Sequence, residues 1–377
     1  MTRLKYALIG CGKVAVKHLK AVLYHRDSLE LAALVDTRPD AAAALLKSCG
    51  IDARAAEAIR VFPDCQAMLE AIRPDLVAIT TPSGTHYPLA MQAIAAGAHV
   101  LVEKPLTLSL TEADRLLAAA ADRGVQVAVG HIYRFFPIVQ ALEKDLRAGR
   151  FGRILEGDVK VRWGHDQAYY DQAAWRGTWA QDGGALMNQS IHALDLMTWL
   201  MGSSVRAVSG WIDRQVHRME AEDFGLAMLR LENGSFCQVE GTTNTDPQRQ
   251  EASFYILGTE GEIRCGLLGS KPFLAIRDRK GRKLTGRYLC SYLCDQWRTG
   301  GLAALMQLKN PHSGLYGDLL QAIRAGRAPL ADGRAGRQAV ELILAIYQSA
   351  RTGQTVSLPV REFTLEEMKG YFPPFSS

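Results

Sequence analysis

Apolar residues in the first third of the chain come in short continuous runs, separated by stretches with the spacing of amphipathic helices. Strands that are buried on both faces give such runs, and their alternation with helices is typical of a parallel sheet covered on both sides. The pattern therefore predicts a doubly wound α/β domain, with strands at residues 6–9, 29–35, 60–62, 76–80, 98–102 and 125–129.

The pattern changes near residue 131. Strands now follow one another with few helices between them, and turn signals such as Asn233-Gly234 and Glu260-Gly261 separate them. This arrangement predicts an α+β domain with an open, mainly antiparallel sheet, whose strands lie at 154–163, 205–216, 223–231, 235–243, 251–257 and 262–265. We place the first domain at residues 1–131 and the second at residues 132–377.

The turn after the first apolar run carries the spacing Gly-x-Gly-x-x-Ala over residues 10–15. A glycine turn that leads from a strand into a helix lets backbone N–H groups approach a pyrophosphate at the helix N-terminus. The turn therefore predicts a dinucleotide-binding (Rossmann) domain. The residues expected to form its phosphate-binding part are Gly10, Gly12, Lys13 and Val14.

The second apolar run ends at Asp36, where a carboxylate is expected to hydrogen-bond the adenosine ribose. Asp36 favours NAD over NADP, because a 2′-phosphate would meet a negative charge. Arg38 offers that phosphate a partner, so the choice of NAD remains an expectation.

Two further turns follow the fourth and fifth strands, at the edge of the sheet where open α/β folds bind ligands. Glu103-Lys104-Pro105 directly follows a buried strand, so we expect Lys104 to face the ligand rather than to form an ordinary surface ion pair. The other turn is expected to contribute cofactor-binding residues or, alternatively, to be a plain loop capped by Thr85. Its candidate residues are Thr81, Pro82, Ser83 and His86.

One helix interrupts the strands of the second half, over residues 183–200. It is apolar around most of its surface, which predicts a buried helix. Asn188, His192 and Asp195 nevertheless follow one another at i, i+4 and i+7, which puts them in one polar stripe. Buried polar groups need partners, so the stripe indicates either a core histidine satisfied by Asp195 or, as the glycines at the helix entrance favour, an active site.

Composition narrows the class of protein. The chain has 377 residues, 48% of them hydrophobic, and no apolar run reaches the roughly 18 residues of a membrane helix. The first strand begins within a few residues of the start, so we expect a cytoplasmic protein without a signal peptide. The net charge of +5 comes with no nucleic-acid motif. Cys290 and Cys294 lack a second pair, so we expect no metal site and seven reduced cysteines.

Five motifs in sequence resemble the glucose-fructose oxidoreductase / inositol 2-dehydrogenase (Gfo/Idh/MocA) family, over about residues 4–270. They are Gly10-x-Gly12-x-x-Ala15, Thr81-Pro82-x-x-x-His86, Glu103-Lys104-Pro105, Arg134-Phe135-x-Pro137 and Gly183-Gly184-x(7)-His192-x-x-Asp195. The resemblance implies an NAD(P)-dependent dehydrogenase acting on CH–OH groups. It also implies that Lys104 lies beside the nicotinamide and the substrate hydroxyl, and that His192 is the acid/base.

The chain departs from the commoner family pattern at Asn188, where most members carry Asp. With Tyr169-Tyr170 and the segment 175–179 ahead of it, this version resembles the branch that oxidises UDP-linked N-acetylamino sugars or their uronates at C3. Asn cannot take a proton, so we assign the base to His192, oriented by Asp195, with Lys104 stabilising the alkoxide. The reverse assignment, with Lys104 as the base, stays open. Further residues expected to line the cofactor and substrate cleft are Glu103, Arg134, Trp163, Trp175 and Arg176.

Other functions compete with this prediction. One is a free inositol, polyol or aldose dehydrogenase of the same fold, and another is a non-catalytic NAD-binding regulator; a hydrolytic or lyase cycle with bound NAD is a minor option. We expect a small-molecule sugar or sugar-nucleotide substrate, no membrane or nucleic-acid partner, and a homodimer or homotetramer formed through the open sheet. The apolar segment 288–312 is expected to be a lid or part of a subunit interface.

Overall fold

The computed structural model describes residues 2–306 and 310–373. The chain divides into two compact units. The first unit comprises Met1–Phe135 and Gln307–Arg337, and the second comprises Phe136–Met306 and Gln338–Ser377. A late segment of the chain thus belongs to the first unit. The domain boundary at residue 131 stays a prediction.

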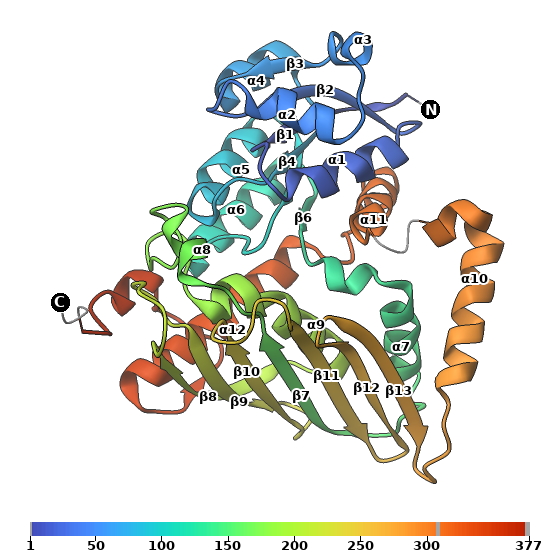
Figure 1. Ribbon diagram of the computed structural model, residues 1–377, viewed down its shortest axis with the longest axis vertical. Helices are drawn as coiled ribbons and strands as arrows, with labels where there is room; N and C mark the ends of the chain where they lie inside the picture. The colour runs from blue at the N-terminus through green and yellow to red at the C-terminus, as the bar shows by residue number, and fades with distance from the viewer. Residues whose placement is uncertain (1, 307–309, 374–377) are drawn as a thin grey trace. The chain divides into compact units, whose positions relative to one another are not determined.

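The first unit contains the expected six-stranded sheet, in the order β3-β2-β1-β4-β5-β6 with every neighbouring pair parallel (Figure 1). Strand order reverses between β1 and β4, and ligands bind at such a switch point in open α/β sheets. The strands are β1 (Leu4–Ile9), β2 (Leu29–Val35), β3 (Arg60–Phe62), β4 (Leu76–Ile79), β5 (His99–Val102) and β6 (Val127–Val129).

Helices cover both faces of this sheet. Alternate side chains of its strands therefore belong to two separate hydrophobic cores. Tyr6 and Leu8 of β1 belong to one core and Ala7 and Ile9 to the other. The first core is closed by α1 (Ala15–Tyr24), α2 (Ala41–Ser48) and α11 (His312–Ala325). The second is closed by α4 (Cys65–Ile72), α5 (His86–Ala95) and α6 (Leu110–Arg123); a short α3 (Ala53–Ala56) lies between β2 and β3 in the chain.

The second unit is built on an eight-stranded sheet in the order β13-β12-β11-β7-β10-β9-β8-β14. Only the β7–β10 pair is parallel among the strands described, so the expected mainly antiparallel sheet is confirmed. The strands are β7 (Ile154–Arg162), β8 (Val205–Asp213), β9 (Phe224–Leu231), β10 (Phe236–Thr242), β11 (Glu251–Gly258), β12 (Gly261–Leu268), β13 (Lys271–Asp278) and β14 (Val356–Ser357).

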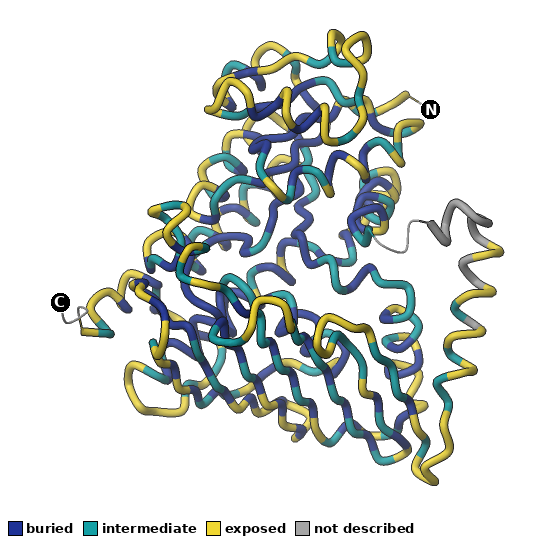
Figure 2. Tube along the Cα trace, in the orientation of Figure 1, coloured by how far each residue is buried: buried dark blue, intermediate teal, exposed yellow. Residues whose placement is uncertain are grey.

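One face of this sheet packs against helix α9 (Ile191–Met201), and glycines on the strands make room for it. A Cβ on Gly157 would lie 2.6 Å from the sulfur of Met201, and one on Gly241 would lie 2.3 Å from Oγ of Ser190. The opposite face carries exposed apolar side chains, and the alternation of buried and exposed positions is visible along the strands in Figure 2. Those apolar residues are Trp211, Met228 and Phe236.

The remaining helices of the second unit are α7 (Pro137–Arg147), α8 (Gln167–Asp171), α10 (Thr285–Met306) and α12, which starts in the first unit (Gly333–Thr352). The apolar segment 288–312 is largely α10, on which Leu289, Leu293 and Trp297 are exposed. Residues 307–309 of that segment lie outside the described residues. Across the described parts of the chain, every helix is too short or too polar to span a lipid bilayer.

Candidate active site

The glycine turn between β1 and α1 has the geometry that a pyrophosphate needs. Gly10 has φ +91°, and a Cβ there would lie 2.9 Å from the backbone oxygen of Thr80, directly after the neighbouring strand β4, so only glycine fits. Val14, at the start of α1, makes no side-chain cap among the described residues, and the backbone N–H groups of Ala15 and Lys17 donate to the backbone oxygens of Gly12 and Val14 at 3.2 and 2.9 Å. The N-terminal end of a helix dipole favours an anion at this turn. Gly12 and Val14 are partly exposed and Lys13 is exposed.

Asp36 lies directly beside this turn. Its carboxylate accepts hydrogen bonds from the backbone N–H of Cys11 (2.8 Å) and of Arg38 (2.9 Å). Burial alone would raise the pKa of Asp36, but these hydrogen bonds lower it overall. Asp36 is therefore an ionised group directly after β2, and its contact with the adenosine ribose stays a prediction.

His86 connects the two other turns at this edge of the sheet. Its Nδ1 lies 2.7 Å from the backbone oxygen of Pro105, and its Nε2 lies 3.0 Å from that of Thr81. Burial lowers the pKa of His86. A neutral ring has one N–H, so His86 donates to one of these two backbone oxygens and lies against the other. His86 thus lies between the two turns, while the cofactor contact expected for it stays a prediction. Of its neighbours, Thr81 and Pro82 are half-buried and Ser83 is buried.

Glu103 and Lys104 follow β5 and differ sharply in their surroundings. Glu103 is buried, and its Oε1 accepts a hydrogen bond from Nε2 of His18 at 2.8 Å. Lys104 is half-buried, and its backbone N–H donates to Oε2 of Glu103 at 3.2 Å. Glu103 was expected to line the cleft; in the structure its carboxylate points into a buried polar cluster. Arg134 is also buried, and donates to the backbone oxygen of Leu330 at 3.0 Å.

The helix with the polar stripe begins as a π-helical turn, η3 (Leu186–Ser190), and continues as α9. A π-turn holds more residues than an α-turn, so the regular i, i+4 step assumed from the sequence does not apply between Asn188 and His192. π-turns occur frequently at functional sites. Asn188 and His192 are half-buried, and Asp195 is buried. Lys104 belongs to the first unit and the stripe to the second, so their meeting at one nicotinamide stays a prediction.

Asn188 has a carboxylate as its neighbour. Its Nδ2 donates a short hydrogen bond to Oδ1 of buried Asp182, whose Oδ2 accepts from the backbone N–H of Gly177 at 3.1 Å. The amide oxygen of Asn188 consequently points to Gln189, whose Nε2 donates to it at 2.8 Å. Asp182 was not singled out from the sequence; its position immediately before Gly183-Gly184 was the available signal.

A stack of flat groups lies next to this amide cluster. The rings of His165 and Tyr169 stack at 3.7 Å with an interplanar angle of 3°. The guanidinium of Arg176 lies 4.2 Å from the Tyr169 ring centre and 4.6 Å from that of Trp175. Nε2 of Gln189 lies 3.2 Å from Nε2 of His165, which joins the stack to the amide cluster. The structure thus brings Asn188, Trp175 and Arg176 into one group of side chains.

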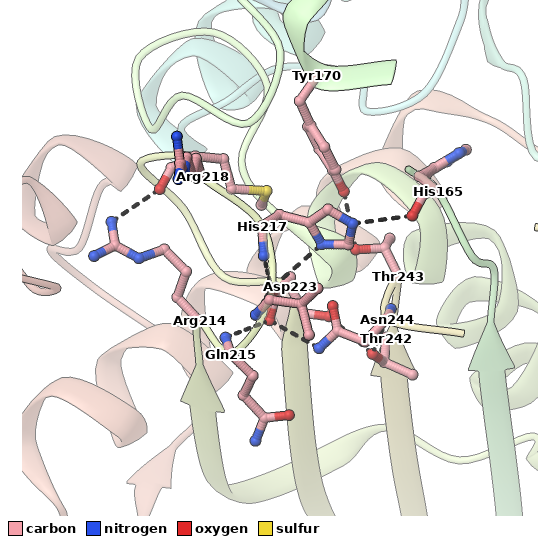
Figure 3. A network of polar contacts seen from close by, with 12 residues as sticks. His165, Tyr170, Arg214, Gln215, His217, Arg218, Asp223, Thr242, Thr243 and Asn244 are labelled. Carbon is pink, nitrogen blue, oxygen red and sulfur yellow. Dashed lines mark hydrogen bonds and ion pairs between the residues drawn. The ribbon is translucent and has the colours of Figure 1, made fainter. Parts of the chain in front are cut away.

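A polar network supports this group from the end of the sheet (Figure 3). Asp223 accepts hydrogen bonds from the backbone N–H groups of residues 215–217, and its carboxylate lies 3.3 Å from Nδ1 of His217. Nε2 of His217 donates to the backbone oxygen of His165 at 2.9 Å. Burial alone would raise the pKa of Asp223, but these partners hold it well below its usual range. The network fixes the chain at His165, and sequence reasoning missed it.

Glu222 acts on the helix itself. Its Oε1 accepts from the backbone N–H of Leu186 at 2.9 Å and from the hydroxyl of Tyr347 at 2.8 Å, so it caps the π-turn. The side chain is fully buried, and burial raises the pKa of Glu222 to about 8. Glu222 therefore caps this helix as a neutral acid at neutral pH.

The seven cysteines are free, as expected, and Cys290 and Cys294 are exposed. The described residues do contain one group of side chains with the composition of a metal site, which is His18, Glu103 and His312 in the first unit.

Fold and side chains together define a dinucleotide-binding protein with a separate polar site on an α+β unit, the organisation of an oxidoreductase. A family profile described as an oxidoreductase family with an NAD-binding Rossmann fold matches residues 4–131. The profile of the GFO/IDH/MocA C-terminal domain matches residues 139–264. The chain belongs to the Gfo/Idh/MocA family of oxidoreductases, and several of its relatives are named dehydrogenases that act on sugar hydroxyls.

Several relatives match, two of them over 90% or more of their own length. The WlbA dehydrogenase of Bordetella pertussis, solved in complex with NADH and UDP-GlcNAcA, is 33% identical, with a TM-score of 0.79 over 96% of this chain and 100% of that one. A D-apiose dehydrogenase of Paraburkholderia graminis is 27% identical over 94% of this chain and 90% of its own. A UDP-N-acetylglucosamine 3-dehydrogenase of Acidithiobacillus ferrooxidans is 32% identical over 52% of this chain and 57% of its own.

Proposed function

We propose that this protein is an NAD-dependent 3-dehydrogenase of UDP-linked N-acetylamino sugars or their uronates. The observation that carries the proposal is the Asn188 group, in which an amide held by Asp182 and Gln189 stands where most family members have a carboxylate. The likeness to a WlbA dehydrogenase solved with UDP-GlcNAcA supports the same substrate class.

The first unit fits NAD on its own geometry. The Gly10 turn and the uncapped start of α1 would hold the pyrophosphate, and Asp36 would hold the adenosine ribose. The negative charge of Asp36 favours NAD over NADP. Bound NAD supplies the hydride acceptor, and the protein supplies orientation and charge around it.

His192 takes the proton from the substrate hydroxyl while C3 gives up its hydride, which leaves a ketone and one released proton per oxidation. Asp195, three residues further on α9, orients the imidazole and stabilises its charged form. Asn188 positions the hydroxyl through its amide oxygen, because an amide cannot take the proton. Lys104 stabilises the developing alkoxide by its positive charge. In the reverse assignment Lys104 is the base and His192 assists.

The stack of His165, Tyr169 and Arg176 supplies a flat cationic surface beside Asn188. Phosphates, carboxylates and planar bases all suit such a surface. We assign it to the nucleotide or uronate part of the substrate. This assignment extends the expectation that Trp175 and Arg176 line the cleft.

The alternative is a dehydrogenase of free sugars or polyols, which the D-apiose dehydrogenase relative favours. A non-catalytic NAD-binding regulator is the remaining alternative from a different class. We also propose that the protein is cytoplasmic and assembles as a homodimer or homotetramer.

A substrate panel tests the proposal. Purified protein at a concentration equal to that of NAD is mixed with UDP-GlcNAcA, UDP-GlcNAc, myo-inositol, D-apiose or D-glucose, and NADH absorbance is recorded, so that one turnover suffices. We expect a signal with a UDP-sugar and none with the free sugars. A signal from a free sugar alone would establish the alternative, and no signal from any of them, with NAD bound, would favour a regulator. Replacing NAD by NADP in the active mixture tests the cofactor preference.

A further inference from the structure

A buried polar cluster in the first unit includes Glu103, the residue next to Lys104. It joins Glu103 to side chains from β1, α1 and α11, which are far apart in the sequence. All of them are at most 8% exposed, and they are Tyr6, His18, Glu103, His312 and Tyr316. The Lys104 turn is therefore backed by titratable groups that the proposed mechanism does not use.

The hydrogen-bond directions around His18 follow from the chemistry of its partners. Glu103 is ionised: burial would raise its pKa, but the histidines hold that pKa well below its usual value. A carboxylate only accepts, so Nε2 of His18, at 2.8 Å from Oε1, carries a proton. Burial lowers the pKa of His18, which favours a neutral ring that donates to Glu103. In a neutral ring Nδ1 accepts from the Tyr316 hydroxyl at 2.9 Å, and the Tyr316 oxygen accepts from Tyr6 at 2.7 Å.

The directions around His312 lead to a different result. The amide nitrogen of Asn310 donates to the backbone oxygen of Lys17 at 3.2 Å, which leaves its amide oxygen facing Nδ1 of His312 at 3.1 Å. Nδ1 of His312 is therefore a donor. Its Nε2 lies 3.6 Å from Oε1 of Glu103, outside hydrogen-bond distance and with no other partner among the described residues. In neutral His312, a buried lone pair would face a carboxylate, which is repulsive.

We propose that His312 is a buried imidazolium that balances the charge of Glu103 and, through Glu103, positions Lys104 and sets its state of charge. The catalytic part of this inference rests on the proposed function, whereas the charge of His312 does not. His312 is a positioning residue, since it acts through Glu103.

The Lys104 turn is held from both sides. Oε2 of Glu103 accepts the backbone N–H of Lys104 at 3.2 Å, and the backbone oxygen of Pro105 lies 2.7 Å from Nδ1 of His86. Glu103 also packs closely against the chain at Gly130, where an added Cβ would lie 2.8 Å from its carboxylate. A change in the cluster is therefore transmitted to Lys104.

The charges of His312 and Glu103 affect the protonation of Lys104, which can be measured and which a purely structural role of the cluster would not change. The charged and titratable groups that face Glu103 are His18 on α1, His312 and Tyr316 on α11, His86 on α5 and the adjacent Lys104. Removing the cation at His312 leaves Glu103 uncompensated, which favours the ammonium form of Lys104. Removing the anion at Glu103 has the opposite effect.

A bound metal ion is the competing explanation for the same three side chains. Two ligand atoms at about 2.0 Å each from one tetrahedral ion would lie about 3.3 Å apart. Nε2 of His18 and Oε1 of Glu103 lie 2.8 Å apart, which is the distance of a hydrogen bond. The geometry therefore favours a proton, and metal analysis forms part of the test.

The experiment measures how the acetylation of Lys104 by acetic anhydride depends on pH, using mass spectrometry of the peptide that contains it, without substrate. We expect the midpoint to rise by about one pH unit in His312→Gln and to fall by about one unit in Glu103→Gln. His25→Gln is the matched control, because His25 also joins α1 to α11, through the backbone oxygen of Ser313 at 2.8 Å. It should leave the midpoint unchanged.

Three results would each overturn the proposal. They are shifts of the same sign in both variants, no shift of the midpoint, and one equivalent of metal in the wild type that is lost in Glu103→Gln. Should His312→Gln not fold, ¹⁵N spectra of histidine-labelled wild type and Glu103→Gln decide. One imidazole protonated on both nitrogens should lose a proton when Glu103 loses its charge; its absence from the wild type contradicts the proposal. Opposite shifts combined with no turnover of any UDP-sugar would leave the charge assignment in place and remove the catalytic role of Lys104.

Discussion

Neighbouring acids in this protein have opposite states of ionisation because their partners differ. Glu222 receives one backbone N–H and one hydroxyl and is fully buried, whereas Asp223 receives three backbone N–H groups and His217. The result is a neutral acid beside a carboxylate in consecutive positions. Both acids support the segment that holds the Asn188 group. Glu222 caps the start of the helix, and Asp223 acts through His217 on His165.

Glu222 makes stability depend on pH. Its pKa in the folded state, about 8, lies above the ordinary value of 4.5, so the folded protein binds the proton more tightly than the unfolded chain. The contribution of Glu222 to the free energy of unfolding is therefore largest below about pH 4.5. It falls as the pH rises toward 8, by at most about 1.4 kcal/mol per pH unit. In Glu222→Gln we expect this loss between pH 5 and 8 to disappear, measured as the pH dependence of the unfolding temperature. Exposed Glu232→Gln is the control; an unchanged slope in Glu222→Gln would contradict the assignment.

The two proposed catalytic groups make a separate prediction. Lys104→Ala and His192→Ala should each reduce NADH formation from the active UDP-sugar by at least about a hundredfold, the range expected for loss of an acid/base or a charge stabiliser. NAD affinity, measured by fluorescence titration, should change little, since the groups assigned to hold the pyrophosphate and the ribose are the Gly10 turn and Asp36. Wild-type turnover in either variant would refute the site.

At the scale of elements, the entrance of the stripe helix depends on Gly184. A Cβ there would lie 2.1 Å from the backbone oxygen of Glu222 and 2.1 Å from its Oε2, and both are held in place. The backbone oxygen accepts from Ala185 and the carboxyl caps Leu186. The helix and the β8–β9 connection thus approach each other at a position where only glycine fits.

Gly184→Ala should destabilise the protein by about 2 kcal/mol or more, because an overpacked backbone contact must move. It should also lower turnover more than NAD affinity, since the displaced helix carries Asn188 and His192. Gly286→Ala, in α10 with open space around it, is the control and should be neutral or stabilising by up to about 1 kcal/mol. Urea unfolding followed by circular dichroism compares the two variants; equal effects would show that the Gly184 contact relaxes freely.

At the scale of the whole molecule, the face of the large sheet opposite α9 is the expected assembly surface. Trp211, Met228 and Phe236 are 65%, 41% and 45% exposed there, on three adjacent strands. Apolar area of this kind suits contact with a second copy.

Replacing Phe236 by Glu should therefore convert an oligomer to monomers in light scattering after size exclusion, because a buried unpaired charge is costly. Val61→Glu, at an exposed apolar position of the first unit, should leave the assembly unchanged. A monomeric wild type, or an oligomer that tolerates the charge at Phe236, would exclude this face.

The amino-acid sequence by itself determined the strands β1 to β12, the nucleotide turn and the family, because these depend on local signals; it did not mark β13 and β14. Continuous apolar runs, glycines with a required backbone geometry and consecutive motifs such as 103–105 can be recognised without knowing what lies beside them. The sequence also marked Asn188, His192 and Asp195, although it treated their helix as regular throughout, since a π-turn has no spacing signature of its own.

Only the tertiary structure decided which polar groups are partners. Asp182 and Asn188 are close in sequence, yet their contact requires the loop between them to fold back. His18, Glu103 and His312 come from three distant segments. His217 contacts His165 across the end of a sheet. Partnership between side chains depends on distance in space and on burial, which the order of residues along a chain does not encode locally. For that reason the charge states of Glu103, Glu222 and Asp223 follow from the fold, while the nucleotide turn could be recognised from its own residues.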